Sequence, residues 1–232
     1  YEGTVSFGTG TKHGAQAILK ASYEIETWDQ SMGKDLADFA WFHTLPFFQA
    51  PVSGPENVFI QMQDFLNQFN PETVFLLTLG GEHSVALAPV SFFHKSYPDL
   101  VVLQLDAHAD LRSTFQGSCY SHACVMARVR DLGIPVVQLG IRSLSRDESE
   151  YIKAQPDHEL LTLFAEDLPG PKEAGAKVAE FIGNRPLYIT FDADGIDPAQ
   201  LPGTGTPEPG GLDYTWLNNF WSALFPGPRL LG

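Results

Sequence analysis

The sequence predicts an α/β fold, a three-layer α/β/α sandwich built around a central and mainly parallel sheet. Two observations predict it. Five short runs rich in leucine, β-branched and aromatic residues lack the polar alternation of half-exposed strands, as is typical of strands covered on both faces. Segments with helical spacing of apolar residues separate these runs, and alternation of strands and helices is the pattern of a parallel sheet between helices.

The predicted elements follow one another along the whole chain. Strands are expected at 74–79 (VFLLTL), 100–105 (LVVLQL), 135–139 (PVVQL), 160–164 (LLTLF) and 187–191 (LYITF). Helices are expected at 53–69, 84–96, 122–132, 146–154, 172–182 and 214–224. No repeat or change in composition divides the chain, so residues 1–232 are expected to form one domain.

Capping chemistry supports several of the helix starts. Ser53 with Glu56, and Ser145 with Glu148, have the spacing of a capping box, which predicts helix starts at these two places. Asp213 is a preferred N-cap residue and is expected to begin the last helix.

The charge balance limits the classes of partner. The 14 Lys and Arg residues are outnumbered by 28 Asp and Glu residues, and the formal net charge of -14 argues against binding to nucleic acid or to an anionic membrane. No apolar run approaches the ~18 residues of a membrane span, and the N-terminal YEGTVSFGTG lacks a signal-peptide layout, so a cytoplasmic location is expected. Cys119 and Cys124 are expected to be reduced structural thiols.

Polar clusters follow three of the predicted strands. They are GGEHS (80–84), DAHADLR (106–112) and DADGID (192–197). In an open parallel sheet, binding sites lie just beyond the carboxyl ends of the strands. The three clusters are therefore expected to converge.

Alternate residues of an extended chain point to the same side, which predicts how the acidic side chains are presented. Asp106, His108 and Asp110 are expected to share one side, and Asp192 and Asp194 are expected to do the same.

Convergence would bring together four aspartates and two histidines with no Lys or Arg among them: His83, Asp106, His108, Asp110, Asp192 and Asp194. Four such carboxylates would repel one another strongly, because buried charges must be paired or bind metal. Four carboxylates and two neutral imidazoles balance two divalent ions, and an oxygen-rich set with some nitrogen suits manganese. The sequence therefore predicts a site for two Mn2+ ions.

Five motifs in this order resemble the ureohydrolase family of arginases and agmatinases, and the agmatinase form most. They are GGEHS (80–84), DAHADLR (106–112), SHA (121–123), FDADGIDPA (191–199) and GTGTPEPGG (203–211). The early GTGTKHGAQAI is similar to the N-terminal loop and helix of the family. The resemblance implies an arginase-like fold and two Mn2+ ions held by His83, Asp106, His108, Asp110, Asp192 and Asp194.

The resemblance also implies a reaction, which is hydrolysis of a guanidino group with release of urea. Metal coordination lowers the pKa of water from ~15.7 toward ~7 and so supplies a nucleophile at neutral pH. His122, in the SHA motif, is the implied proton shuttle, and Asp110 is implied both to ligate metal and to orient the nucleophile. The alternative for His122 is a histidine at a helix N-terminus that is satisfied by backbone.

Agmatine is the expected substrate, giving putrescine and urea. The segment RSTFQGSCYSHA (112–123) resembles the agmatinase form of its loop, and the acidic charge favours a dication. The alternatives are arginine, guanidinobutyrate or a formimino compound as substrate, or a metal-binding family member without catalysis.

Both ends of the chain bear on the resemblance. The first strand of the family would precede Tyr1, and the last would follow near Leu231 and Gly232. That last strand carries the glutamate that pairs with the guanidinium, so this acid is expected beyond Gly232, with Glu208 as the alternative within the chain. The resemblance also implies a homo-oligomer, a trimer or a hexamer.

Overall fold

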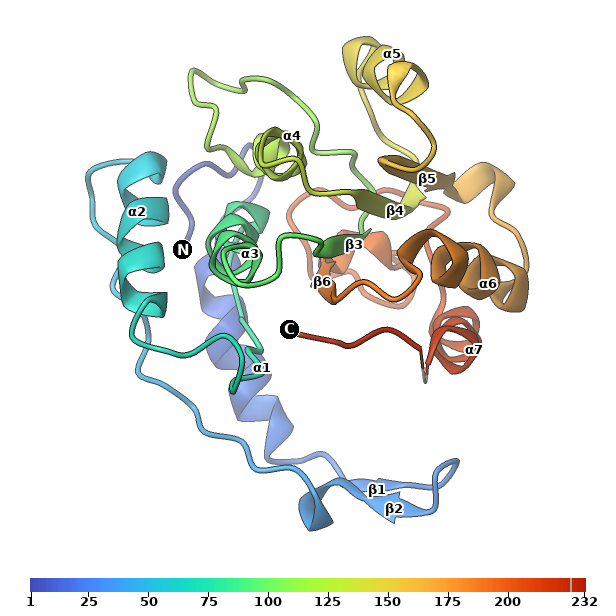
Figure 1. Cartoon of the computed structure of the whole chain (residues 1–232). Coiled ribbons are helices and arrows are strands. Elements are labelled where there is room, and N and C mark those ends of the chain that lie inside the picture. The colour runs from blue at the N-terminus through green and yellow to red at the C-terminus, as the bar shows by residue number, and fades with distance from the viewer. Residues whose placement is uncertain (226) are drawn as a thin grey trace.

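The central sheet has four strands, all parallel, in the order β5-β4-β3-β6 (Figure 1). The computed structural model describes residues 1–225 and 227–232. The strands are β3 (Val101–Leu105), β4 (Val136–Ile141), β5 (Leu160–Phe164) and β6 (Leu187–Phe191). Four of the five predicted strands are thereby confirmed.

All six predicted helical segments are helical, and one further helix lies near the N-terminus. They are α1 (Gly14–Ser22), α2 (Pro55–Leu66), α3 (Leu87–His94), α4 (Val125–Asp131), α5 (Arg146–Ala154), α6 (Pro171–Ile182) and α7 (Tyr214–Leu224). Short 3-10 helices, η3 (His83–Ala86) and η4 (His122–Cys124), precede α3 and α4. These two turns carry two of the predicted site histidines.

The predicted caps are correct for α5 and α7 but wrong for α2. Ser145 and Glu148 form the capping box of α5. Asp213 Oδ1 accepts a hydrogen bond from the backbone N–H at the start of α7. The N-cap of α2 is instead Gly54, which has no side chain to cap with and adopts a positive φ of 97°. Pro55 then fixes the first turn, so Ser53 lies one residue too early to form the predicted box.

Helices cover both faces of the sheet, which confirms the three-layer sandwich. One apolar core joins the sheet to α2, α3 and α4 and includes the fully buried Phe93. The other joins it to α6 and α7 and includes the fully buried Phe220. Neighbouring residues of β3 alternate between these cores, with Val102 in the first and Leu103 in the second.

The predicted strand at 74–79 is wrong, because this segment runs extended without forming a ladder. Leu76 N donates to Leu231 O over 3.4 Å, and the C-terminal residues in turn pair with β6 through the isolated bridge of Leu187 to Leu230. Phe75 and Leu77 are 59% and 68% exposed, so the segment is not covered on both faces as predicted.

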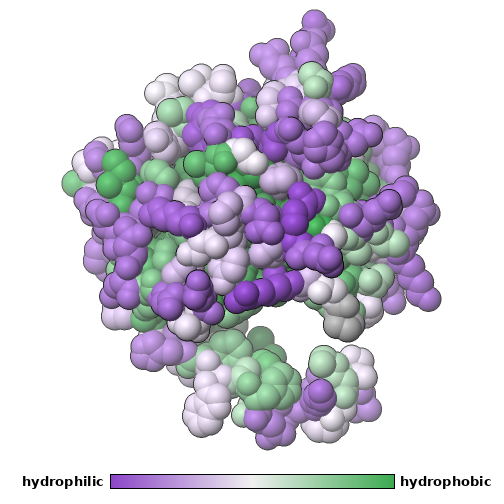
Figure 2. All heavy atoms as spheres, viewed as in Figure 1, coloured by the Kyte–Doolittle hydropathy of each residue, from purple (hydrophilic) through white to green (hydrophobic). Residues whose placement is uncertain are grey.

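Residues 23–52 form an arm that projects from the body and carries an antiparallel hairpin of β1 (Trp28–Asp29) and β2 (Lys34–Asp35) (Figure 1). Figure 2 shows apolar side chains on this arm, and Trp28 and Met32 are among the exposed ones. The hairpin has no counterpart among the elements predicted from the sequence. None of the helices in residues 1–225 and 227–232 is long and apolar enough to cross a membrane.

Candidate metal centre

The predicted polar clusters meet at the carboxyl ends of β3 and β6. Asp106 directly follows β3 and Asp192 directly follows β6. These strands are hydrogen-bonded neighbours, and Asp192 N donates to Leu105 O over 2.8 Å. Parallel pairing therefore places the two acidic loops side by side, as the sequence predicts.

One group of donors is centred on the ring of His83, which η3 presents to the loops after the strands. His83 Nδ1 lies 2.9 Å from Asp106 Oδ2, 2.9 Å from Asp110 Oδ2 and 3.5 Å from Asp192 Oδ2. His83, Asp106 and Asp110 are buried, whereas the Asp192 side chain is 25% exposed. Ligand atoms of the three buried residues lie within 4.8 Å of one another, close enough to hold one metal ion.

A second group of donors adjoins the first and shares Asp106 with it. His108 Nδ1 lies 3.1 Å from Asp194 Oδ2 and 3.6 Å from Asp106 Oδ1. Asp106 thus turns Oδ2 toward the first group and Oδ1 toward the second. Asp106, His108 and Asp194 could hold a second ion, so the structure brings five of the six predicted ligands into two adjoining groups, with Asp192 beside the first.

The donor set fits divalent cations. A single ring N–H of His83 faces three carboxylates, whereas a buried cation contacts several oxygens at once. Burial and repulsion among these carboxylates shift their pKa values. Burial and the Asp106 charge raise the pKa of Asp110 to about 7, and burial with the charges of Asp106 and Asp194 raises the pKa of Asp192 to about 8.

The histidines and Asp106 respond in the opposite sense to burial. Burial acts to lower the pKa of His108, but its contacts with Asp106 and Asp194 outweigh burial and raise that pKa to about 11. Burial also acts to lower the pKa of His83, but its contacts with Asp106 and Asp110 raise that pKa well above its usual value. Burial acts to raise the pKa of Asp106, yet its contacts with both histidines hold it below the usual range.

Simple alternation along an extended strand does not explain the convergence, and that part of the prediction is wrong. Both strands end before their acidic motifs, and Asp194 lies in the 3-10 helix η6 (Ala193–Gly195). Asp110 adopts a positive φ of 54°, a conformation rare for residues other than glycine. Tight turns after the strands, rather than strand pleating, therefore aim these carboxylates.

A row of hydrogen-bonded polar side chains, buried except for the half-buried Thr162, crosses the sheet beneath the donors and was not predicted from the sequence. Thr162 Oγ1 donates to Gln138 Oε1 over 3.0 Å, and Gln138 Nε2 donates to Gln104 Oε1 over 2.7 Å. Gln104 Nε2 then donates to Asp106 Oδ2 over 2.8 Å. On the other side of β3, Thr190 Oγ1 lies 2.8 Å from His83 Nε2.

The sequence does contain a signal for this row. Gln104 and Thr190 interrupt otherwise apolar strands, and each lies two residues before a predicted ligand, Asp106 and Asp192. Residues that orient metal ligands are needed because a free carboxylate or imidazole would rotate. A polar residue at such a position is therefore an expected support for the site.

His122 begins η4, which packs against η3. Its ring Nδ1 lies 3.2 Å from Thr4 Oγ1, its Nε2 lies 3.5 Å from Ser6 Oγ, and the Phe115 ring meets it edge-on at a centroid distance of 5.7 Å. Burial lowers the pKa of His122 and so favours the neutral ring. The hydrogen-bond contacts of its ring nitrogens are with side-chain hydroxyls, those of Thr4, Ser6 and Ser121, and its backbone N–H also donates to Thr4 Oγ1.

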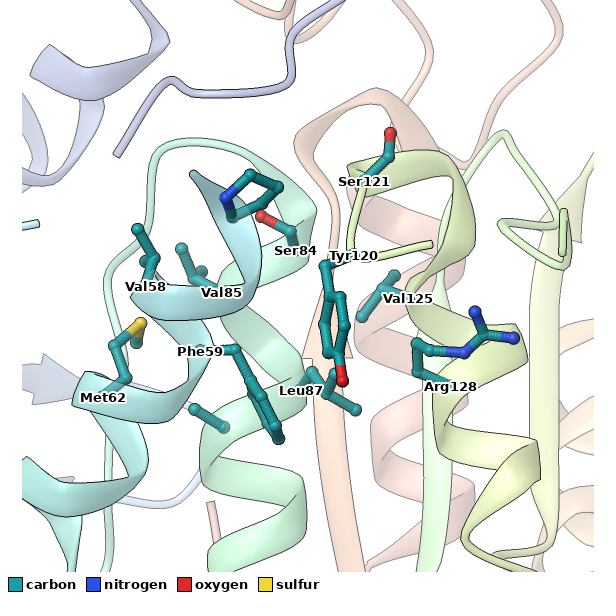
Figure 3. A pocket seen from close by; sticks show the side chains of 12 residues that line it. Val58, Phe59, Met62, Ser84, Val85, Leu87, Tyr120, Ser121, Val125 and Arg128 are labelled. Atoms are coloured by element: carbon teal, nitrogen blue, oxygen red, sulfur yellow. The ribbon is translucent and has the colours of Figure 1, made fainter. Parts of the chain in front are cut away.

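A narrow apolar pocket between α2, α3 and α4 supports the segment that leads to His122 (Figure 3). Figure 3 shows the Tyr120 ring directed into this pocket, with Ser84 and Ser121 toward its upper end. The rings of Phe59 and Tyr120 stack with centroids 5.5 Å apart. Packing of Tyr120 thus holds the neighbouring His122 in place.

Glu208 lies on the loop that faces the second group of donors. Its Oε1 is 4.0 Å from His108 Nε2, and the side chain is 40% exposed. Arg142 ties this loop to the donors, because its Nη2 donates to Glu208 O over 2.7 Å and to Asp194 O over 2.6 Å. Glu208 is therefore a solvent-accessible acid at the edge of the site.

Known proteins resemble this chain along its length. N(1)-aminopropylagmatine ureohydrolase of Synechocystis sp. is 32% identical over 238 residues, covering 100% of this chain and 76% of that relative. Agmatinase of Bacillus subtilis is 33% identical over 217 residues, covering 90% of this chain and 70% of that relative.

A solved structure of a related enzyme has the same fold. The structure of agmatine ureohydrolase of Thermoplasma volcanium superposes with a TM-score of 0.80 at 30% identity, covering 98% of this chain and 77% of that one. The model of the arginase family matches residues 1–231. The chain therefore belongs to the arginase family and is a hydrolase of the agmatinase and ureohydrolase type.

Proposed function

We propose that this enzyme hydrolyses the terminal guanidino group of agmatine, releasing putrescine and urea, at a centre that holds two Mn2+ ions. The observation that carries the proposal is the pair of adjoining donor groups that share Asp106. Two divalent cations neutralise four carboxylates, and oxygen donors with two imidazoles suit manganese.

The proposed ligands are the six residues at the ends of β3 and β6 and in η3: His83, Asp106, His108, Asp110, Asp192 and Asp194. When bound, the two cations would supply the Lewis acidity that makes water nucleophilic at neutral pH. Asp110 has the added role of orienting that nucleophile. Its Oδ2 lies 2.9 Å from His83 Nδ1, and its backbone adopts a positive φ. The Asp110 carbonyl accepts a hydrogen bond from Met126 N, which anchors the residue to α4.

His122 is the proposed acid and base. Burial lowers the pKa of His122 and favours the neutral ring, which can accept a proton during attack and return it to the leaving amine. It is placed for this task by η4, which packs against the turn carrying His83.

Charge supports a cationic substrate. The chain carries a net charge of -14, and Glu208 offers an accessible carboxylate at the edge of the site. We propose Glu208 as the acid within this chain that pairs with the cationic guanidinium.

A second candidate substrate follows from one relative. The Synechocystis relative is named for N(1)-aminopropylagmatine, which carries the same guanidino group on a longer polyamine. The reaction would be the same, with urea leaving and an aminopropyl-extended diamine remaining.

Urea release from a panel of guanidino compounds tests the proposal. We expect agmatine or aminopropylagmatine to exceed arginine and guanidinobutyrate, because the latter two carry a carboxylate into an acidic site. Preference for arginine would contradict the substrate assignment. Release of formamide from a formimino compound, without urea from the others, would contradict the reaction.

We also propose a homo-oligomer, a trimer or a hexamer, on the basis of the family resemblance. Light scattering should give three or six times the 25.5 kDa chain mass. A mass of 25.5 kDa would contradict this assembly and leave the chemistry of the site untouched.

A further inference from the structure

Glu82, in the GGEHS motif, is buried beside the proposed metal centre, yet the reaction described above gives it no task. Its carboxylate is surrounded by four hydrogen-bond donors. Oε2 accepts from Gly3 N over 2.8 Å and from Thr4 N over 2.7 Å. Oε1 accepts from Ser84 Oγ over 2.7 Å and from the Thr4 hydroxyl.

Thr4 joins this carboxylate to the ring of His122. Thr4 Oγ1 lies 3.2 Å from His122 Nδ1 and also accepts from His122 N over 3.0 Å. We propose that Glu82 and Thr4 are positioning residues that hold His122 as the Nδ1–H tautomer and leave Nε2 as the atom that accepts and donates protons. The kinetic part of this inference rests on the proposed function, whereas the tautomer itself does not.

Counting protons leads to this tautomer. Thr4 has a single hydroxyl proton, and a carboxylate accepts but cannot donate, so that proton lies toward Glu82. Thr4 then presents only lone pairs to His122, where it receives the backbone N–H and faces Nδ1. An unprotonated Nδ1 would set lone pair against lone pair at 3.2 Å, whereas a protonated Nδ1 donates a hydrogen bond.

The contacts of the other ring atoms agree with this assignment. Ser121 Oγ lies 3.4 Å from Nδ1, longer than the Thr4 contact, and can also accept from it. Nε2 has the exposed Ser6 hydroxyl at 3.5 Å, a contact at the limit of hydrogen bonding. Nε2 is therefore the ring nitrogen free to exchange protons.

The N-terminal segment therefore helps to position His122. Gly3 and Thr4 are tied to Glu82 by their backbone N–H groups, and Glu82 N donates to Tyr1 O over 3.2 Å. Because Glu82 directly precedes His83, the contacts of the N-terminal residues with Glu82 help to position both His122 and the proposed metal ligand His83.

Three variants test the pair. Thr4→Val removes the hydroxyl at nearly constant shape, and Thr4→Ser retains it. Glu82→Gln keeps its carbonyl oxygen for the two backbone N–H groups and turns its amide N–H toward Thr4, which frees the Thr4 proton to donate to Nδ1. Glu82→Gln should therefore favour the opposite tautomer.

The direct measurement is a long-range 1H–15N correlation spectrum of the full chain labelled with 15N-histidine, without added metal. The His122→Asn spectrum identifies the His122 signals. We expect Nδ1–H in the wild type and in Thr4→Ser, a mixture in Thr4→Val, and mainly Nε2–H in Glu82→Gln. An Nε2–H wild type would overturn the proposal, and so would spectra that Thr4→Val and Glu82→Gln leave unchanged.

The kinetic measurement uses manganese-loaded enzyme and agmatine. Thr4→Val should lower kcat by about 10²-fold at unchanged KM and metal content, and Thr4→Ser should retain most of the rate. Equal rates for Thr4→Val and Thr4→Ser would contradict a role in catalysis. If the wild type releases no urea, the proposed function fails, while the spectra still decide the tautomer. Should Thr4→Val not fold, the near-isosteric Glu82→Gln carries the same test.

Discussion

Asp106 and His83 meet in the buried centre of the site, with Asp106 Oδ2 2.9 Å from His83 Nδ1, although they come from different elements. His83 belongs to the turn before α3, and Asp106 ends β3. The other oxygen of Asp106 faces His108, so one carboxylate serves both donor groups. The position of Asp106 therefore determines whether both cations can bind.

Gln104 is predicted to hold Asp106 in its orientation. Gln104→Leu removes the hydrogen bond to Asp106 Oδ2 and one of the two hydrogen bonds that Gln138 Nε2 donates, leaving the one to Ala109 O. We expect metal affinity to fall about 10–100-fold and the metal-free protein to lose ~1–3 kcal/mol of stability. Calorimetric metal titration and denaturant unfolding measure these two effects.

Thr162→Val is the matched control, because it breaks the same row at its far end. It should lower stability by ~1 kcal/mol and leave metal affinity unchanged. If Gln104→Leu also left metal affinity unchanged, the polar row would serve folding alone.

The sequence suffices for much of the fold and for the proposed ligands. β3 to β6 are long enough and apolar enough to be recognised without their neighbours, and a parallel sheet must place their carboxyl ends together. Asp106 and Asp192 follow from that rule alone. The tight turns that then aim Asp110 and Asp194 do not, since they depend on local backbone geometry.

Other features depend on tertiary contacts that sequence patterns do not record. The apolar run at 74–79 has strand composition, but within the described part of the chain its backbone pairs with the C-terminal residues through one hydrogen bond, from Leu76 N to Leu231 O. The projecting arm exposes Trp28 and Met32, against the usual burial of such side chains. Thr4 lies far from Glu82 and His122 in sequence, and only the folded chain brings the three together.

Metal affinity is predicted to rise with pH, because binding must displace protons. The metal-free site holds protons with pKa values of about 7 for Asp110, about 8 for Asp192 and about 11 for His108. Raising the pH removes these protons, so affinity for Mn2+ should increase from about pH 6 to about pH 9. Calorimetry in buffers of different ionisation enthalpy should show proton release on binding, and its absence would contradict the pKa assignments.

Stability of the metal-free protein should change in the opposite direction. These three folded-state pKa values exceed their unfolded values of ~3.9 for Asp and ~6.5 for His, so the folded state binds more protons in this window. The stability that these bound protons contribute to the folded state is complete below each group's unfolded pKa and is lost as the pH rises through its folded pKa. Thermal unfolding should therefore show a falling Tm toward pH 9 without metal and a growing Tm increase on adding Mn2+.

Glu208 is predicted to contribute to substrate binding. Glu208→Gln removes the accessible charge near His108 while keeping the shape of the loop that Arg142 holds. We expect KM for agmatine to rise about tenfold, the worth of one charge-assisted contact, with a smaller effect on kcat. Glu173→Gln, an exposed change on α6, is the control and should alter neither constant. An unchanged KM in Glu208→Gln would place the guanidinium-binding acid elsewhere.

His122 separates a catalytic site from one that only binds metal. His122→Asn should retain two Mn2+ ions and lower kcat by roughly 10²–10⁴, the usual range for a positioned acid or base. His158→Asn, at an exposed histidine, should leave the rate unchanged. Loss of a metal ion in His122→Asn would make His122 a ligand, and full urea release would remove it from the reaction.

The most direct test of a two-metal hydrolase is titration of the metal-free protein with Mn2+ while urea release from agmatine is followed. Activity should rise until two equivalents per chain are bound and then remain constant. Asp106→Asn, which removes the carboxylate common to both donor groups, should bind fewer than two ions and release little urea, whereas the exposed Asp131→Asn should match the wild type. Saturation at one equivalent, or two bound ions without urea from any guanidino compound, would contradict the proposed centre.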